Sequence, residues 1–146
     1  MPKQKGFTLV ELMIALAIMS ILAMIAIPAV GNAIRKSQEA VTIANLAILR
    51  MSIASYNAET GDYPTDNLDS LIGFHLRAVP VRYAPTYHPS DSRIVNAECV
   101  EGSGGWCYCN QNSSPRFGEI TVNCTHLNLR GQPWATPSDL VCELEP

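Results

Sequence analysis

Charged side chains are scarce in this chain, and the small excess of charge is not basic. Of its 146 residues 16% are charged, and 10 Lys and Arg against 13 Asp and Glu give a net charge of −3. A protein that binds the phosphates of nucleic acid needs a basic surface, and this charge composition does not indicate one. We therefore expect no nucleic-acid site.

Motifs of the common enzyme classes are also missing from the sequence. It contains no G-x-S-x-G, H-E-x-x-H, Walker A or C-x-x-C-H pattern. His75, His88 and His126 are isolated from one another along the chain. The sequence therefore predicts neither an enzyme nor a cofactor, and no metal site.

Cysteine is absent before Cys99 and is concentrated in the last third of the chain. Small loop-rich domains use disulfides when their core is thin, and disulfides persist in oxidising compartments. Together with the membrane-length apolar run described below, this indicates that residues 60–146 lie outside the cytoplasm; the alternative is reduced, buried thiols in a cytosolic protein. The five candidates for disulfide bonds are Cys99, Cys107, Cys109, Cys124 and Cys142.

Two bridges would leave one of these thiols unpaired. The preferred pair is Cys124–Cys142, which would tie the tail to the last predicted strand, and Cys99 with Cys107 or Cys109 is the second choice. A zinc or copper site made of Cys107, Cys109, Cys124 and His126 is an alternative. It is disfavoured because structural zinc sites usually use C-x₂₋₄-C spacing.

One long hydrophobic run stands out against this background. The 24 residues from Phe7 to Val30 contain a single ionisable side chain, Glu11. As a helix this run is about 36 Å long, enough for a hydrocarbon core of about 30 Å. We expect it to span a membrane. A carboxylate in lipid is costly unless it is paired, so Glu11 is a candidate functional residue; the alternative is that it only reaches the interface.

The order of features around this run differs from that of a secretory signal, because the small residue Gly6 precedes the apolar stretch. The N-terminus resembles that of type IV pilins and of the pseudopilins of type II secretion. The resemblance is carried by a short basic leader ending in Lys5-Gly6, by Phe7-Thr8-Leu9-Val10-Glu11-Leu12-Met13, and by Ala26-Ile27-Pro28.

The family implies cleavage between Gly6 and Phe7 by a prepilin peptidase, followed by N-methylation of Phe7. It also implies that Glu11 pairs with the terminal amine of a neighbouring subunit during filament assembly. The chain would then be a structural subunit of a type IV pilus or pilus-like filament.

Such a subunit would wait as a precursor in the bacterial inner membrane and then enter an extracellular or periplasm-spanning filament. Its partners would be copies of itself, other pilins, the prepilin peptidase and the assembly machinery. Major pilin, minor pilin and secretion pseudopilin remain open. A function of a different class is a single-pass membrane protein whose cysteine-rich head binds a ligand or metal as a monomer.

The helical pattern continues beyond the apolar run. It is expected to end near Glu59, because Gly61 can cap a helix and Pro64 cannot extend one. Pro28 and Gly31 are possible sites of a kink. Apolar or small residues recur in steps of three and four at Val30, Ile34, Ser37, Val41, Ala44, Ile48, Met51 and Ser55. This stripe is predicted to hold the sheet of the head domain, with a partner-binding coiled coil as the weaker alternative.

The predicted fold class is α+β, a long N-terminal helix with a membrane-spanning first half packed on a small antiparallel β-sheet head. The expected segments are a leader at 1–6, a transmembrane or filament-core helix at 7–30, an amphipathic half at 31–59 and the head at 60–146. Strands are predicted at Ile94–Val100, Gly105–Cys109 and Glu119–Asn123. On the middle strand, Trp106 and Tyr108 face one side and Cys107 and Cys109 the other.

Residues 62–92 are predicted to form a loop with one short helix. Asp66 can cap this helix, and its apolar side chains Leu68, Leu71 and Ile72 would face inward.

Overall fold

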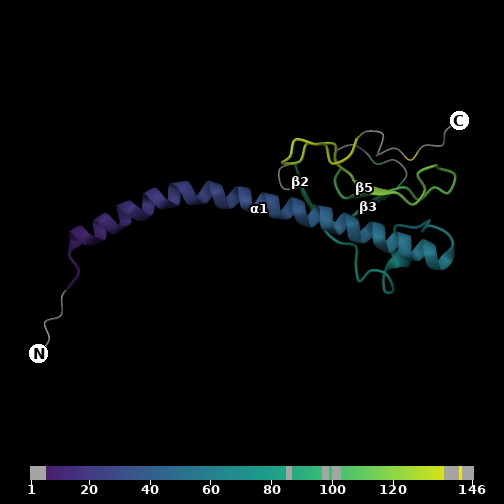
Figure 1. Cartoon of the computed structure of the whole chain (residues 1–146), viewed down its shortest axis with the longest axis horizontal. Helices are drawn as coiled ribbons and strands as arrows, with labels where there is room; N and C mark the ends of the chain where they lie inside the picture. Colours follow the sequence, from purple (N-terminus) through teal and green to yellow (C-terminus); the bar gives the residue numbers. More distant parts are fainter. Residues whose placement is uncertain (1–5, 85–86, 97–98, 100–102, 137–141, 143–146) are drawn as a thin grey trace, which may run out of the picture. The chain divides into compact units, whose positions relative to one another are not determined.

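The structure is a computed structural model that describes residues 6–84, 87–96, 99, 103–136 and 142. It is an α+β fold, as predicted (Figure 1). The elements are α1 (Leu9–Thr60), the 3₁₀-helix η1 (Asp69–Leu71), β1 (Arg82–Ala84), β2 (His88–Asp91), β3 (Ile94–Asn96), β4 (Trp106–Tyr108) and β5 (Ile120–Val122). The chain forms two compact units, Met1–Arg35 and Lys36–Pro146.

Helix α1 is 52 residues long and confirms the long helix predicted from the sequence. Its helical assignment is continuous through Pro28 and Gly31. The helix ends at Thr60 because Gly61 adopts a left-handed conformation (φ 82°). The Gly61 N–H donates to the Asn57 carbonyl at 2.8 Å, which satisfies one of the carbonyls left free at the helix end.

The core of the head domain lies between the C-terminal part of α1 and the strands. From the helix it takes Leu49 and Ile53, which are almost fully buried. They pack in one cluster with Leu68, Leu71, Leu76, Trp106, Tyr108, Ile120, Val122 and Cys124. Figure 1 shows β3 and β5 close to this stretch of α1.

The helix face that covers this core is not the predicted one. Its buried residues are Thr42, Leu49, Ser52 and Ile53, whereas the predicted stripe from Val41 through Met51 to Ser55 is exposed. The prediction was wrong by one position along the chain, a rotation of about 100° around the helix. Apolar side chains occur on both faces here, so the spacing alone did not identify the buried one.

Polar residues of the buried face form hydrogen bonds with residues far away in the sequence. The Thr42 hydroxyl donates to the Tyr83 carbonyl and accepts the Tyr83 N–H, both at 2.8 Å. Ser52 Oγ donates to the Ile48 carbonyl of the same helix at 2.9 Å and lies 3.4 Å from the His75 carbonyl. Tyr83 and His75 lie 41 and 23 positions away in the sequence, so local periodicity carries no sign of them.

Two small sheets form the rest of the head. Strands β1 and β2 pair antiparallel, and β3, β4 and β5 form a three-stranded sheet in that order. Strands β3, β4 and β5 fall inside the three predicted ranges but are shorter in the described residues. The pairing differs in one respect: β4 and β5 are antiparallel as expected, whereas β3 and β4 run parallel, with Ile94 opposite Trp106. Residues 97–98 and 100–102 lie outside the described residues.

Strands β1 and β2 fall in the region predicted to be loop. Their sequences, RYA and HPSD, are too short to show alternation, and Pro89 reads as a strand breaker. The short helix predicted nearby is present as η1. Asp66 accepts the Ser70 N–H at 2.9 Å, and Leu68 and Leu71 are buried, but Ile72 is 42% exposed and does not face inward.

Buried side chains of β4 anchor the loop that follows α1. The Tyr108 hydroxyl donates to the Pro64 carbonyl at 2.6 Å, and Trp106 Nε1 donates to the Pro80 carbonyl at 2.8 Å. Both side chains are fully buried on the core side of the sheet, as predicted, while Cys107 packs in a separate cluster with Cys99 and Ala135.

The disulfides differ from the preferred pairing. Cys99 is bonded to Cys107, one of the two partners expected for it, and Cys109 is bonded to Cys142. All five cysteines are among the described residues, and Cys124 is the one left without a disulfide. Cys124 lies instead in the main core, where it is fully buried.

Candidate functional site

The predicted cleavage point lies outside regular structure. Gly6 and Phe7 precede α1 and are in neither a helix nor a strand. The Phe7 side chain is 85% exposed, and apart from the chain neighbours of Gly6 no heavy atom lies within 4 Å of the position that a Cβ on Gly6 would take. The surroundings of Gly6 and Phe7 are thus open, and cleavage between them stays a prediction. Residues 1–5 of the predicted leader lie outside the described residues.

Glu11 is hydrogen-bonded to the start of its own helix. Its Oε2 accepts the Thr8 N–H at 2.9 Å and the Thr8 hydroxyl at 2.8 Å. The Glu11 N–H in turn donates to Thr8 Oγ1 at 3.2 Å. Two side chains that satisfy each other's backbone N–H groups in this way form a capping box.

Thr8 is therefore a residue that the sequence reasoning missed. The pattern Thr8-x-x-Glu11 directly before an apolar helix is the sequence signature of a capping box, so the signal was available. Glu11 has a local structural role in addition to any role in assembly. Its pairing with the terminal amine of a neighbouring subunit stays a prediction.

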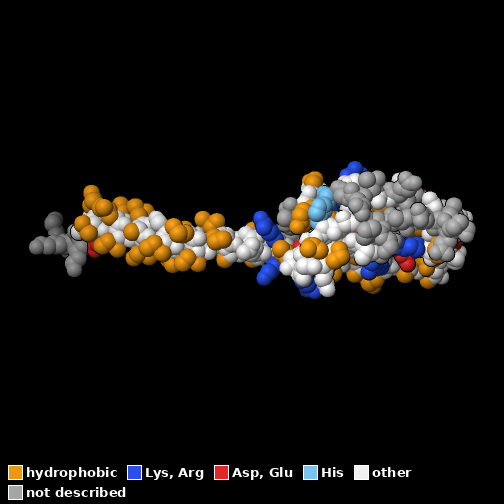
Figure 2. Space-filling view, turned by 90° about the horizontal axis from the view of Figure 1, so that it is seen from above, with side chains coloured by type: hydrophobic (Ala, Val, Ile, Leu, Met, Phe, Trp, Pro, Cys, Tyr) orange, Lys and Arg blue, Asp and Glu red, His pale blue; other side chains and the backbone are white. Residues whose placement is uncertain are grey.

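The helix that follows is covered with exposed apolar side chains. Within the first compact unit, Leu12, Met19, Ile25 and Ile27 are each more than half exposed, as are most of their large apolar neighbours from Leu9 to Ile34. Figure 2 shows these hydrophobic side chains along the N-terminal part of the helix. Among the described residues, α1 is one helix that is long and apolar enough to cross a membrane.

A second uncovered apolar stripe belongs to the head unit. It consists of Val41, Ala44, Ile48, Met51 and Ser55, all exposed, with Met51 at 72%. The same stretch of α1 therefore has one face in the head core and another, rotated by about 100°, that is exposed. We call the second face the outer stripe.

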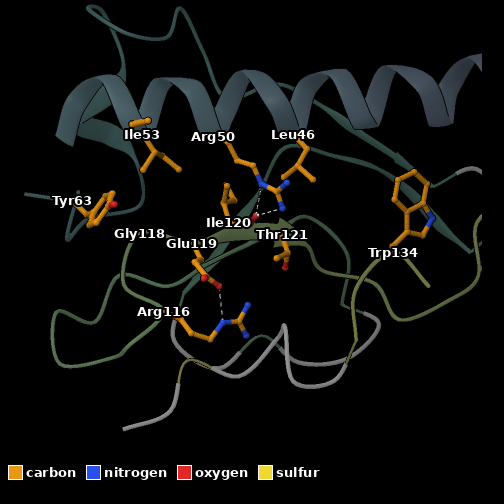
Figure 3. A pocket seen from close by; sticks show the side chains of 11 residues that line it. Leu46, Arg50, Ile53, Tyr63, Arg116, Gly118, Glu119, Ile120, Thr121 and Trp134 are labelled. Carbon is orange, nitrogen blue, oxygen red and sulfur yellow. Dashed lines mark hydrogen bonds and ion pairs between the residues drawn. The ribbon is translucent and has the colours of Figure 1, made fainter. Parts of the chain in front are cut away.

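A groove of about 440 Å³ lies between α1 and the edge strand β5 (Figure 3). Arg50 reaches across it, and its Nε and Nη2 atoms donate to the Ile120 carbonyl at 3.4 and 3.3 Å. On the other side Arg116 pairs with Glu119 at 2.7 Å. Since an edge strand is a template for unwanted pairing, the Arg50 contact protects a carbonyl of this edge.

The alternative zinc or copper site was to consist of Cys107, Cys109, Cys124 and His126. The structure brings Cys124 and His126 together, but Cys107 and Cys109 form disulfides and cannot bind a metal ion with them. His88 takes their place, because one ligand atom from each of His88, Cys124 and His126 lies within 4.8 Å of the others. The rings of His88 and His126 are 5.1 Å apart. The interpretation of the histidines as isolated was therefore wrong for His88 and His126, whereas His75 lies outside this group.

Similarity to known proteins begins at the N-terminus. The model of the prokaryotic N-terminal methylation motif matches residues 1–27. The chain is 32% identical over 102 residues to the type IV major pilin protein PilE of Neisseria gonorrhoeae, covering 65% of this chain and 61% of that protein. No solved structure matches the chain.

Two further relatives extend this similarity. The type IV major pilin protein PilA of Myxococcus xanthus is 33% identical over 118 residues, which cover 80% of this chain and 53% of PilA. The fimbrial protein EcpC of Eikenella corrodens is 41% identical over 64 residues, 44% of this chain and 42% of EcpC. The chain thus spans about two fifths to three fifths of the length of these relatives. In its N-terminal methylation motif, its long apolar helix and its small sheets, the chain is thus similar to type IV pilins.

Proposed function

We propose that the chain is a structural subunit of a type IV pilus or pilus-like filament, cut after Gly6 and assembled from the bacterial inner membrane. The observation that carries this proposal is the N-terminal motif placed directly before an uncovered apolar helix. The role is structural and requires no catalytic residue.

The length of the helix supports storage in a membrane. From Leu9 to Val30 it extends about 33 Å, which matches a hydrocarbon core of about 30 Å. Its side chains are too apolar to remain in water, so they belong either in lipid or against other copies of the same helix. Copies related by one repeated contact that does not close would form a filament.

The outer stripe supports contacts between subunits beyond the membrane-length segment. Ile48 and Met51 are exposed on α1, whereas Leu49, the residue next to Ile48, is buried in the head core. In the sequence analysis this stripe was assigned to the head core, with contact to a partner as the alternative. Its exposure favours the partner, which we propose to be the helix of a neighbouring pilin.

The proposal includes the partners and location implied by the family: other pilins, a prepilin peptidase and the assembly machinery, first at the inner membrane and then in the filament. It covers major pilins, minor pilins and secretion pseudopilins alike. A monomeric receptor with one membrane span would have the same helix but would never enter a filament.

Substitutions at the capping box separate the charge of Glu11 from its capping role. Glu11→Gln keeps the hydrogen-bonding side chain of the box and removes the charge, whereas Thr8→Ala removes the cap and keeps the charge. If Glu11 pairs with an incoming amine, Glu11→Gln and Glu11→Ala should both reduce filament incorporation strongly, and Thr8→Ala should reduce it less. Incorporation is measured by immunoblot of filaments sheared from cells that make the export machinery.

Membrane insertion and cleavage are the controls for these variants, and all three should retain both. Mass spectrometry of the mature protein should find a methylated Phe7 at the N-terminus. A retained Met1, or a cut near Ala29, would contradict the proposed processing. Normal incorporation of Glu11→Gln would remove the pairing role, and a wild-type chain that stays out of sheared filaments would favour the monomeric receptor.

A further inference from the structure

The head contains a group of metal-binding side chains that a filament role does not use. His88 is the first residue of β2, and Cys124 and His126 lie just after β5. The Cys124 Sγ and His126 Nδ1 atoms are 3.4 Å apart, and all three residues place a ligand atom within 4.8 Å of the others. The group joins two segments that lie 36 residues apart in the sequence.

Cys124 has the features of a metal ligand as well as those of a core residue. It is fully buried and, of the five cysteines, it is the one not used in a disulfide. A metal ion bound here would displace the proton of the Cys124 thiol.

The two histidines are poised to complete the site. Among the described residues, His88 Nε2 is buried without a hydrogen-bond partner, a state that proteins normally avoid. The ring of Tyr87 stacks on that of His126, with centroids 4.2 Å apart and planes at 15°. This stacking fixes the orientation of the His126 imidazole. A Cys124–His126 hydrogen bond alone would leave His88 unsatisfied.

We propose that His88, Cys124 and His126 bind a thiophilic d¹⁰ metal ion, Zn²⁺ or Cu⁺, through one thiolate and two imidazoles. Zinc lies about 2.3 Å from a thiolate and about 2.0–2.1 Å from an imidazole, so tetrahedral ligands are about 3.6 Å apart. The Sγ–Nδ1 distance of 3.4 Å already matches this value. Three ligands leave one position for a solvent molecule with Zn²⁺, or a trigonal site with Cu⁺.

Such a site would cross-link a part of the head that the two disulfides do not reach. The disulfides join Cys99 to Cys107 and Cys109 to Cys142, so neither one includes the β1–β2 hairpin. The metal ion would tie this hairpin, through His88, to the segment that follows β5. The proposal is independent of the filament role and stands or falls separately from it.

The test is metal titration of the full-length protein, purified in detergent with its disulfides intact. Co²⁺ serves as the spectroscopic probe, because a thiolate ligand gives a charge-transfer band that carboxylates and water do not. We expect one equivalent of Co²⁺ to bind with this band, and Zn²⁺ or Cu⁺ to displace it. Whichever ion displaces it at the lower concentration is the preferred one.

Three single substitutions then identify the ligands. Cys124→Ser should abolish the charge-transfer band, and His88→Gln and His126→Gln should each weaken binding by more than about 100-fold, the upper end for loss of an outer-shell partner. His75→Gln is the matched control, because His75 lies beside Tyr56 and Glu59 and outside the group. It should bind like the wild type.

Thermal unfolding with and without Zn²⁺ keeps the test decisive if a variant folds poorly. Zn²⁺ should raise the Tm of the wild type and of His75→Gln, and should leave that of His88→Gln unchanged. Binding without a charge-transfer band, no binding of any of the three ions, or equal binding by His88→Gln and His75→Gln would each overturn the proposal.

Discussion

The two disulfides are predicted to contribute unequally to the stability of the head. Cys109 and Cys142 close a loop of 33 residues, whereas Cys99 and Cys107 close one of 8. In the loop-entropy description these closures are worth about 3.7 and about 2.5 kcal/mol at 25 °C, because a longer loop loses more freedom in the unfolded chain. The Cα–Cα distances of 5.5 and 5.7 Å suit both bonds.

The perturbation is a pair of double variants, Cys109→Ser with Cys142→Ser and Cys99→Ser with Cys107→Ser. Removing both partners together avoids a new free thiol. The first variant should be less stable than the second by about 1.2 kcal/mol, a difference that depends only on the ratio of the loop lengths. Urea unfolding of the full chain under non-reducing conditions, followed by the fluorescence of Trp106 and Trp134, measures both free energies of unfolding.

Equal losses, or a larger loss from removing the shorter loop, would refute this reasoning. A peptide map under non-reducing conditions provides an independent check of the bonds themselves. It should yield a Cys109–Cys142 peptide, and a peptide linking Cys124 to Cys142 would show that the preferred pairing of the sequence analysis was right after all.

Two further substitutions test the packing of the head by urea unfolding. Thr42→Val removes the hydroxyl that bonds both backbone groups of Tyr83, and should lower the free energy of unfolding by about 1–3 kcal/mol. Thr42→Ser keeps a hydroxyl and should retain most of this stability. An unchanged stability of Thr42→Val would contradict the role of these bonds. Gly118→Ala should be more destabilising than Gly131→Ala, because both glycines have positive φ but only the first would push a Cβ into the Tyr63 ring. Equal effects would show that the ring moves aside freely.

The features near the N-terminus were predictable because their causes are local. A helix needs only its own residues to form, so the apolar run, Gly61 and Pro64 set its bounds to within two residues. The capping box of Thr8 and Glu11 was equally local and could have been identified from the T-x-x-E pattern.

The buried face of α1 was not predictable in the same way. Thr42 and Ser52 look like surface residues in the sequence, and Ile48 and Met51 look like core. The distant backbone of Tyr83 makes Thr42 suitable for burial, and no pattern within the helix reveals this partner. Ser52 is satisfied mainly within the helix, by the Ile48 carbonyl. Where apolar residues occur on both faces, long-range hydrogen bonds decide which one is covered.

The structure of the head was the least predictable part, because it depends on contacts between residues that are far apart in the sequence. The pairing of Cys109 with Cys142 and the burial of Cys124 in the core both depend on the tertiary fold. The meeting of His88 with His126 requires the β1–β2 hairpin, whose two short strands gave no signal. The parallel β3–β4 pair is likewise a tertiary outcome, since short sequence connections usually favour antiparallel neighbours.

The neighbouring positions Ile48 and Leu49 point to a practical consequence for genetic screens. A polar replacement at Leu49 should disrupt the packing of the core and lead to degradation of the subunit, so a screen would detect it by the low abundance of the protein. The same replacement at Ile48 leaves the isolated head intact and would pass every check on expression and solubility. Defects of that second kind become visible only when many subunits must fit together, and a survey of single chains would record them as harmless.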